Sequence, residues 1–122
     1  MSGRSLLVED EEGLRLSISD LLQAEGSEVD TASDGPEGLE MARHATFSLL
    51  VLDVMLPGKS GFDILRDLRA DPATRSLPVM MLTARGQTRD RELAEKLGVT
   101  RFMTKPFSNA EVIENVRALV AG

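Results

Sequence analysis

Short apolar runs that each lead into a polar side chain constrain the fold of this 122-residue chain most strongly. Uninterrupted runs of this length are typical of strands that are buried on both faces of a parallel sheet. They lie at residues 6–8, 49–52, 79–82 and 102–104. The polar side chains that end or follow them are Glu9 and Asp10, Asp53, Thr83 and Lys105. The pattern predicts carboxylates, a hydroxyl and an ammonium at one edge of a sheet.

Helical patterns alternate with the strand signals along the whole chain. We expect strands at residues 5–9, 28–32, 48–52, 78–82 and 101–104. We expect one helix at residues 12–25 and another at residues 62–70. Between and after them, further helices should begin at Pro36, end at Gly98 and begin after Ser108. Gly26 suits the C-cap of the first helix, and Ser108 with Glu111 forms a capping box for the last. Five strands alternating with five helices favour an α/β fold with right-handed crossovers and helices on both faces of a parallel sheet.

The strand order decides which strand ends meet. In a doubly wound, flavodoxin-like (βα)5 sandwich the order is 2-1-3-4-5, and the crevice lies at the carboxyl ends of strands 1 and 3. The first strand ends in Glu9 and Asp10 and the third in Asp53, so this order brings the carboxylates together. The fourth and fifth strands then bring Thr83 and Lys105 to the rim of the crevice.

Length and charge limit the classes of partner. The length fits one domain that spans residues 1–122. The formal net charge of −6 argues against binding of nucleic acid or an anionic membrane by this chain itself. The absence of cysteine excludes disulfides and thiolate metal sites and fits a reducing cytosol. No apolar run approaches the roughly 18 residues of a membrane span.

Clustered carboxylates indicate a cation, because they repel one another unless a proton or a metal ion lies among them. Oxygen ligands without nearby histidine or cysteine favour Mg²⁺, which leaves room for phosphate oxygens. A carboxylate can also attack phosphorus to form an aspartyl phosphate. Taken singly, Asp53 could be a solvated loop residue, Thr83 a helix N-cap and Lys105 a surface ammonium. Their convergence at one sheet edge favours a shared function in phosphoryl transfer.

The whole chain resembles the receiver domain of two-component response regulators, the CheY-like family. The segments that carry the resemblance are residues 6–11, residues 52–57 with Gly61, residues 78–84 and residues 105–107. The resemblance implies that Asp53 is the phosphoacceptor. It also implies that Mg²⁺ is bound by Asp10, Asp53 and the main-chain carbonyl of Met55. Glu9 stands where the family often has Asp, and it would act mainly through water.

The same resemblance implies a switch. Thr83 and Lys105 would sense the phosphoryl group, and the Lys105–Pro106 peptide bond is expected to be cis. Phe102 lies where the family keeps a switch aromatic. Its movement would change the face that is built by the last two helices and the last strand. The arginines near this face, at positions 85, 89 and 91, have either an output role or a merely solvating one.

The implied partners are a sensor histidine kinase or histidine phosphotransfer protein, and a downstream protein or fused output domain. The expected location is the cytoplasm. The domain would be no enzyme beyond its own phosphorylation and dephosphorylation. The chain could be a stand-alone receiver or part of a larger regulator, and a homodimer is compatible with the fold, although no residue indicates one.

Three other interpretations of the function remain open. A haloacid-dehalogenase-type phosphatase expects a second Asp at the position of Met55. A flavin-binding module needs a phosphate loop after the first strand, where this chain has four acidic residues at positions 9–12. A phosphorylation-independent interaction domain would usually have lost a site residue, and none is lost here.

Overall fold

The computed structural model describes residues 3–84 and 88–121, which form alternating strands and helices. In chain order these are β1 (Arg4–Val8), α1 (Glu12–Ala24), β2 (Glu28–Ala32), α2 (Gly35–His44), β3 (Leu49–Asp53), α3 (Gly61–Ala70), β4 (Val79–Thr83), α4 (Thr88–Lys96), β5 (Arg101–Thr104) and α5 (Asn109–Ala121). Every predicted element is present, and most bounds agree to within one residue. None of the described helices is both long and apolar enough to cross a bilayer.

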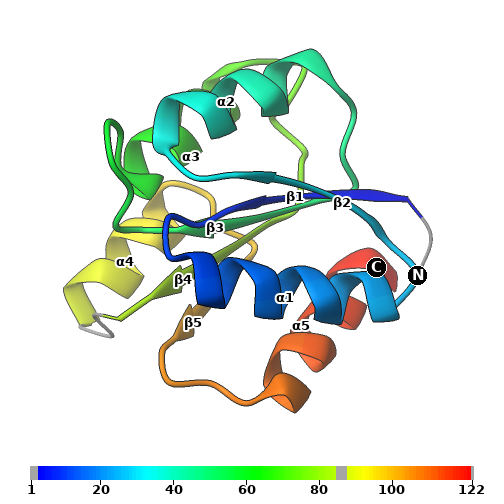
Figure 1. Cartoon of the computed structure of the whole chain (residues 1–122). Helices are drawn as coiled ribbons and strands as arrows, with labels where there is room; N and C mark the ends of the chain where they lie inside the picture. The colour runs from blue at the N-terminus through cyan, green and yellow to red at the C-terminus, as the bar shows by residue number, and fades with distance from the viewer. Residues whose placement is uncertain (1–2, 85–87, 122) are drawn as a thin grey trace.

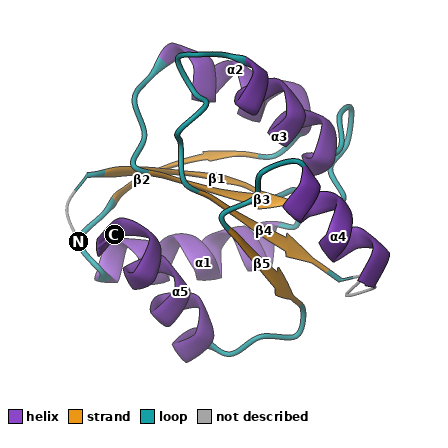
Figure 2. Ribbon diagram, turned by 180° about the vertical axis from the view of Figure 1, so that it is seen from behind, coloured by secondary structure: helices purple, strands orange, loops and turns teal. Residues whose placement is uncertain are grey.

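The sheet is parallel, and its strand order is β2-β1-β3-β4-β5, as predicted. Helices α2, α3 and α4 cover one face, and α1 and α5 cover the other (Figures 1 and 2). The result is a three-layer sandwich with the doubly wound topology. Because the winding direction reverses between β1 and β3, the carboxyl ends of these two strands border the crevice that the topology creates.

Two hydrophobic cores, one on each side of the sheet, explain why the strands read as continuous apolar runs. In β3, Leu50 and Leu52 pack under α2 and α3, whereas Leu49 and Val51 pack against α1 and α5. All four side chains are at most 1% exposed. Successive strand residues point to opposite faces, so a strand covered on both sides carries apolar side chains toward both faces. Asp53 is the first residue of β3 to break this rule.

Helix boundaries follow the local capping chemistry. Helix α5 has the predicted capping box, in which Ser108 Oγ accepts from the Glu111 amide at 3.1 Å. Gly26 follows α1 with φ of 91°, a conformation that glycine adopts without strain. Helix α2 begins one residue earlier than we expected, at Gly35, because the Asp34 carboxylate accepts from the Glu37 amide at 2.8 Å. Pro36 is therefore the second residue of this helix, not the first.

Candidate functional site

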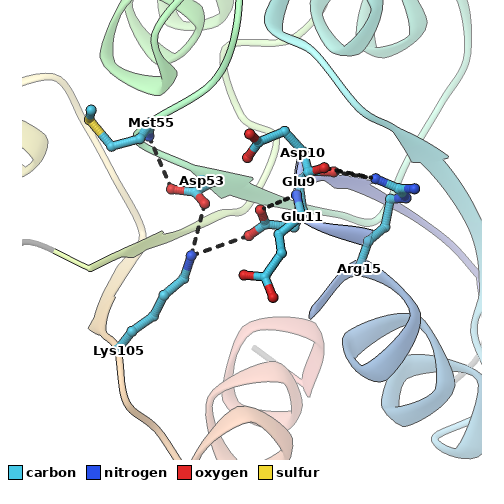
Figure 3. Close-up of polar contacts among 7 residues, drawn as sticks. All are labelled: Glu9, Asp10, Glu11, Arg15, Asp53, Met55 and Lys105. Atoms are coloured by element: carbon cyan, nitrogen blue, oxygen red, sulfur yellow. Dashed lines mark hydrogen bonds and ion pairs between the residues drawn. The ribbon is translucent and has the colours of Figure 1, made fainter. Parts of the chain in front are cut away.

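The polar side chains that were predicted to converge do lie together at the carboxyl edge of the sheet. Val8 pairs with Leu52, so Glu9 and Asp53 emerge side by side from β1 and β3. Lys105 follows β5, two strands away, and its side chain reaches back over the end of β4 to the acids (Figure 3). The Lys105 amide donates to the Thr83 carbonyl at 2.8 Å, which joins the ends of β4 and β5.

Three carboxylates form the centre of this site. Glu9, Asp10 and Asp53 each offer one oxygen, and these oxygens all lie within 4.8 Å of one another. Glu9 and Asp53 are only 1% and 4% exposed, whereas Asp10 is open to solvent. Such a set of oxygen donors, with no histidine or cysteine in it, fits a hard divalent cation such as Mg²⁺.

The Lys105 ammonium supplies positive charge to the two buried acids. Its Nζ lies 2.9 Å from Asp53 Oδ2 and 3.3 Å from Glu9 Oε1. Partial burial acts to lower the pKa of Lys105, but its hydrogen bond with Asp53 and the charges of both acids outweigh this effect and raise the pKa. Lys105 therefore stays protonated and holds the Asp53 carboxylate in place.

Glu9 is the most perturbed acid of the site. Burial, followed by hydrogen bonding with Asp53 and its negative charge, raises the pKa of Glu9 to about 7. The Glu11 amide, which donates to Glu9 Oε2 at 3.0 Å, and the Lys105 ammonium act in the opposite direction without cancelling the rise. A buried carboxylate with so high a pKa is typical of a functional site.

The turn after Asp53 orients the carboxylate from the other side. The Met55 amide donates to Asp53 Oδ1 at 3.0 Å, and Lys105 binds the other oxygen, so both carboxylate oxygens are held. The end of this loop lies close to its beginning, because the Gly61 amide donates to the Val54 carbonyl at 2.9 Å. A Cβ at Gly61 would lie 2.3 Å from the Asp53 carbonyl oxygen, so only glycine fits here. The match of Gly61 to the family motif was noted in the sequence, but this steric reason depends on the fold.

The predicted switch residues lie along β4 and β5. Thr83 is fully buried at the end of β4, and Phe102 is half-buried in β5. The Arg91 guanidinium of α4 lies over the Phe102 ring, 5.1 Å from its centroid, at a distance that suits a cation–π contact. Arg91 thus has a specific contact, whereas Arg85 lies outside the described residues. The Lys105–Pro106 bond is cis, as expected.

One residue of the site was not predicted from the sequence. Arg15, on α1, donates through Nη1 to the carbonyl of Glu9 at 2.9 Å and to the carbonyl of Asp10 at 3.4 Å (Figure 3). The available signal was its position within the first helical turns after the acidic loop. A long side chain there points back toward the N-terminus of its helix.

Comparison with known proteins places this chain in a family. Residues 6–117 match the response regulator receiver domain. Because the match covers most of the chain, the chain belongs to this family of receiver domains.

Relatives of known name agree with this assignment. The chain is 42% identical over 114 residues to the phosphate regulon transcriptional regulatory protein PhoB of Rhizobium meliloti, with 93% of this chain and 50% of PhoB covered. It is 40% identical over 119 residues to the response regulator PleD of Caulobacter vibrioides, with 98% of this chain and 26% of PleD covered. The chain thus spans half or less of the length of these relatives.

Solved structures share the whole fold. The chemotaxis response regulator CheY4 of Vibrio cholerae matches with a TM-score of 0.91 at 28% identity, over 98% of this chain and 99% of that one. The receiver domain of the sensor histidine kinase PA1611 from Pseudomonas aeruginosa matches with a TM-score of 0.91 at 27% identity, over 100% of both chains. That structure has a magnesium ion coordinated in its active site cleft.

Proposed function

We propose that this receiver is a phosphorylation switch in which Asp53 accepts a phosphoryl group from a phosphohistidine. The donor would be a sensor histidine kinase or a histidine phosphotransfer protein. The observation that carries the proposal is the placement of Asp53, which is buried among two further carboxylates with an ammonium 2.9 Å from one of its oxygens. An aspartate that was only an exposed loop residue would need neither burial of its carboxylate nor a lysine ammonium beside it.

The transfer is a displacement at phosphorus. An Asp53 oxygen attacks the phosphorus atom, the bond from phosphorus to the histidine nitrogen breaks, and its electron pair stays on the imidazole. The Met55 amide holds the plane of the Asp53 carboxylate. Lys105 moves from the carboxylate to a phosphoryl oxygen, where its positive charge offsets the negative charge of the transferred group. Thr83, at the end of the neighbouring strand, donates its hydroxyl to another phosphoryl oxygen.

The proposed ligands of Mg²⁺ are Asp10, Asp53 and the main-chain carbonyl of Met55, with Glu9 acting mainly through water. The fit rests on the three carboxylate oxygens that lie within 4.8 Å of one another and on the absence of softer donors among them. When bound, Mg²⁺ supplies positive charge and orients the phosphoryl oxygens. Lys105 follows β5 and Asp10 follows β1, so the two side chains lie on different sides of Asp53 (Figure 3).

In this proposal, the output signal is a change of the protein surface that begins with the movement of Thr83 in the pocket. Recruitment of Thr83 to the phosphoryl group frees space beside β5, and Phe102 turns into it. This movement breaks the contact of Phe102 with Arg91 and alters the face formed by α4, β5 and α5. The altered face then binds a downstream protein or a fused output domain. The chain acts on no other substrate and catalyses only its own phosphorylation and dephosphorylation.

Mass spectrometry after incubation with acetyl phosphate and Mg²⁺ tests the assignment. The wild type should gain the mass of one phosphoryl group and lose it on treatment with hydroxylamine, which cleaves acyl phosphates. Asp53→Asn should gain none. Asp20→Asn, which removes an exposed carboxylate of α1, should behave as the wild type does. An Asp53→Asn protein that is still phosphorylated mainly on another carboxylate would refute the proposal.

A further inference from the structure

The guanidinium of Arg15 holds the main chain of the loop that carries two of the three site carboxylates. Its Nη1 donates to the carbonyl of Glu9 at 2.9 Å and to the carbonyl of Asp10 at 3.4 Å. Figure 3 shows the side chain rising from α1 alongside this loop, on the side away from Lys105. Arg15 itself is half-buried, so its side chain has less freedom than that of a fully exposed arginine.

Other contacts hold the two ends of this loop: the Glu9 amide donates to the Ala32 carbonyl at 3.0 Å, and the Arg15 amide donates to the Glu11 carbonyl at 2.9 Å. The loop consists of residues 9–11, between the end of β1 and the start of α1. Glu11 is the N-cap residue of α1, but its side chain makes no capping hydrogen bond. The Glu9 side chain accepts from the Glu11 amide. Among the described residues no hydrogen bond restrains the Asp10 carboxylate, so its position depends on the main chain to which Arg15 donates.

We propose that Arg15 is a positioning residue for the metal site. By binding the carbonyls of Glu9 and Asp10, it fixes the loop so that both carboxylates converge on Asp53. Arg15 itself touches neither the phosphoryl group nor the metal. The inference rests on the proposed function in one respect, which is that the three carboxylates bind Mg²⁺.

Charge and positioning predict opposite effects when Arg15 is removed, so the two roles can be separated. If Arg15 acted only through its charge, loss of a cation near a cation site would tighten Mg²⁺ binding. If Arg15 positions the loop, its loss weakens Mg²⁺ binding. Removal of hydrogen-bonding partners behind metal ligands typically lowers metal affinity by roughly 10- to 100-fold. Because Mg²⁺ keeps several waters of its own, we expect the lower end of this range.

The experiment compares Arg15→Met, Arg15→Lys and wild type in a Mg²⁺ titration followed by NMR. Arg15→Met keeps a long apolar stem without donors, and Arg15→Lys keeps the charge with a single ammonium. The control is Arg66→Met, which removes an exposed arginine of α3 that pairs with Asp63, away from the site. We expect about a tenfold rise in the Mg²⁺ dissociation constant for Arg15→Met. Arg15→Lys should show a smaller rise, and Arg66→Met almost none.

A second measurement needs no metal. In Mg²⁺-free protein, the Glu11 amide, which donates to Glu9 Oε2, should exchange with solvent faster in Arg15→Met than in wild type. Core amides of β3 should exchange as before, which excludes general unfolding. Mg²⁺ affinity in Arg15→Met equal to or tighter than that of wild type would overturn the inference, as would unchanged exchange at Glu11. A wild type that binds Mg²⁺ but is not phosphorylated at Asp53 would refute the proposed function and leave the positioning result standing.

Discussion

Glu9 should make the protein less stable as the pH rises when no divalent cation is present. Burial, together with the neighbouring Asp53, raises the pKa of Glu9 from 4.5 to about 7. Between these values the native protein keeps a proton that the unfolded chain has released, so a rise in pH favours unfolding. The stabilisation is complete below pH 4.5 and is lost by about pH 7. The shift corresponds to about 3 kcal/mol, an upper limit because the pocket opens to water beside Asp10.

Urea unfolding in the presence of EDTA, from pH 4.5 to about pH 8, measures this effect. Glu9→Gln has a similar shape but cannot titrate, so its stability should lack this part of the pH dependence. The free energy of unfolding of wild type should fall relative to that of Glu9→Gln by up to about 3 kcal/mol across the range. Glu11→Gln, which changes an exposed acid of the same loop, is the matched control and should follow wild type.

Added Mg²⁺ should flatten the wild-type profile, because a bound cation favours ionised carboxylates and binds only the native state. Parallel profiles for wild type and Glu9→Gln in EDTA would refute the reasoning. They would mean that Glu9 is ionised throughout and that Lys105 and the Glu11 amide compensate for its burial.

Two further predictions concern the ligands and the switch. Asp10→Ala should weaken Mg²⁺ binding more than Glu9→Ala, because Asp10 is proposed to bind the metal directly and Glu9 through water; equal losses in a Mg²⁺ titration would contradict these roles. Thr83→Ala should still be phosphorylated but should blunt the response of Phe102 to beryllofluoride, a mimic of the phosphoryl group, because the ligand acts on Phe102 through Thr83. NMR of fluorine-labelled Phe102 measures this response, and a wild-type response in Thr83→Ala would show that the signal leaves by another route.

Much of the fold could be predicted because both faces of the sheet are covered. A strand under helices on both sides is mostly apolar until it reaches the edge of the sheet. The first polar residue after each run therefore marks both the end of the strand and the border of the crevice. The topological switch between β1 and β3 then brings Asp53 next to Glu9. These steps need the pattern of apolar residues, the handedness of crossovers and the strand order of the flavodoxin-like fold.

Other features of the site depend on side-chain contacts across the chain. The high pKa of Glu9 requires its burial beside Asp53, which no local pattern reveals. The earlier start of α2 was readable in principle, since Asp34 and Glu37 have the spacing of an N-cap pair, but we gave more weight to Pro36. The role proposed for Arg15 depends on the path of its side chain over the loop, because helical spacing alone does not select which main-chain carbonyls it reaches.

The site buries charged carboxylates, whereas the rest of the interior buries mainly apolar side chains, and this burial of charge bears on function. Two carboxylates buried side by side cost stability, and Lys105 offsets only part of that cost, as the raised pKa of Glu9 indicates. In the proposed function, the same unfavourable charge would attract a divalent cation, and the cation would in turn favour approach of an anionic phosphoryl group. If further positive side chains neutralised these carboxylates, the folded protein would be more stable, but the pocket would bind Mg²⁺ less well. Under the proposed function, the stability lost by burying Glu9 and Asp53 together would be recovered when Mg²⁺ binds.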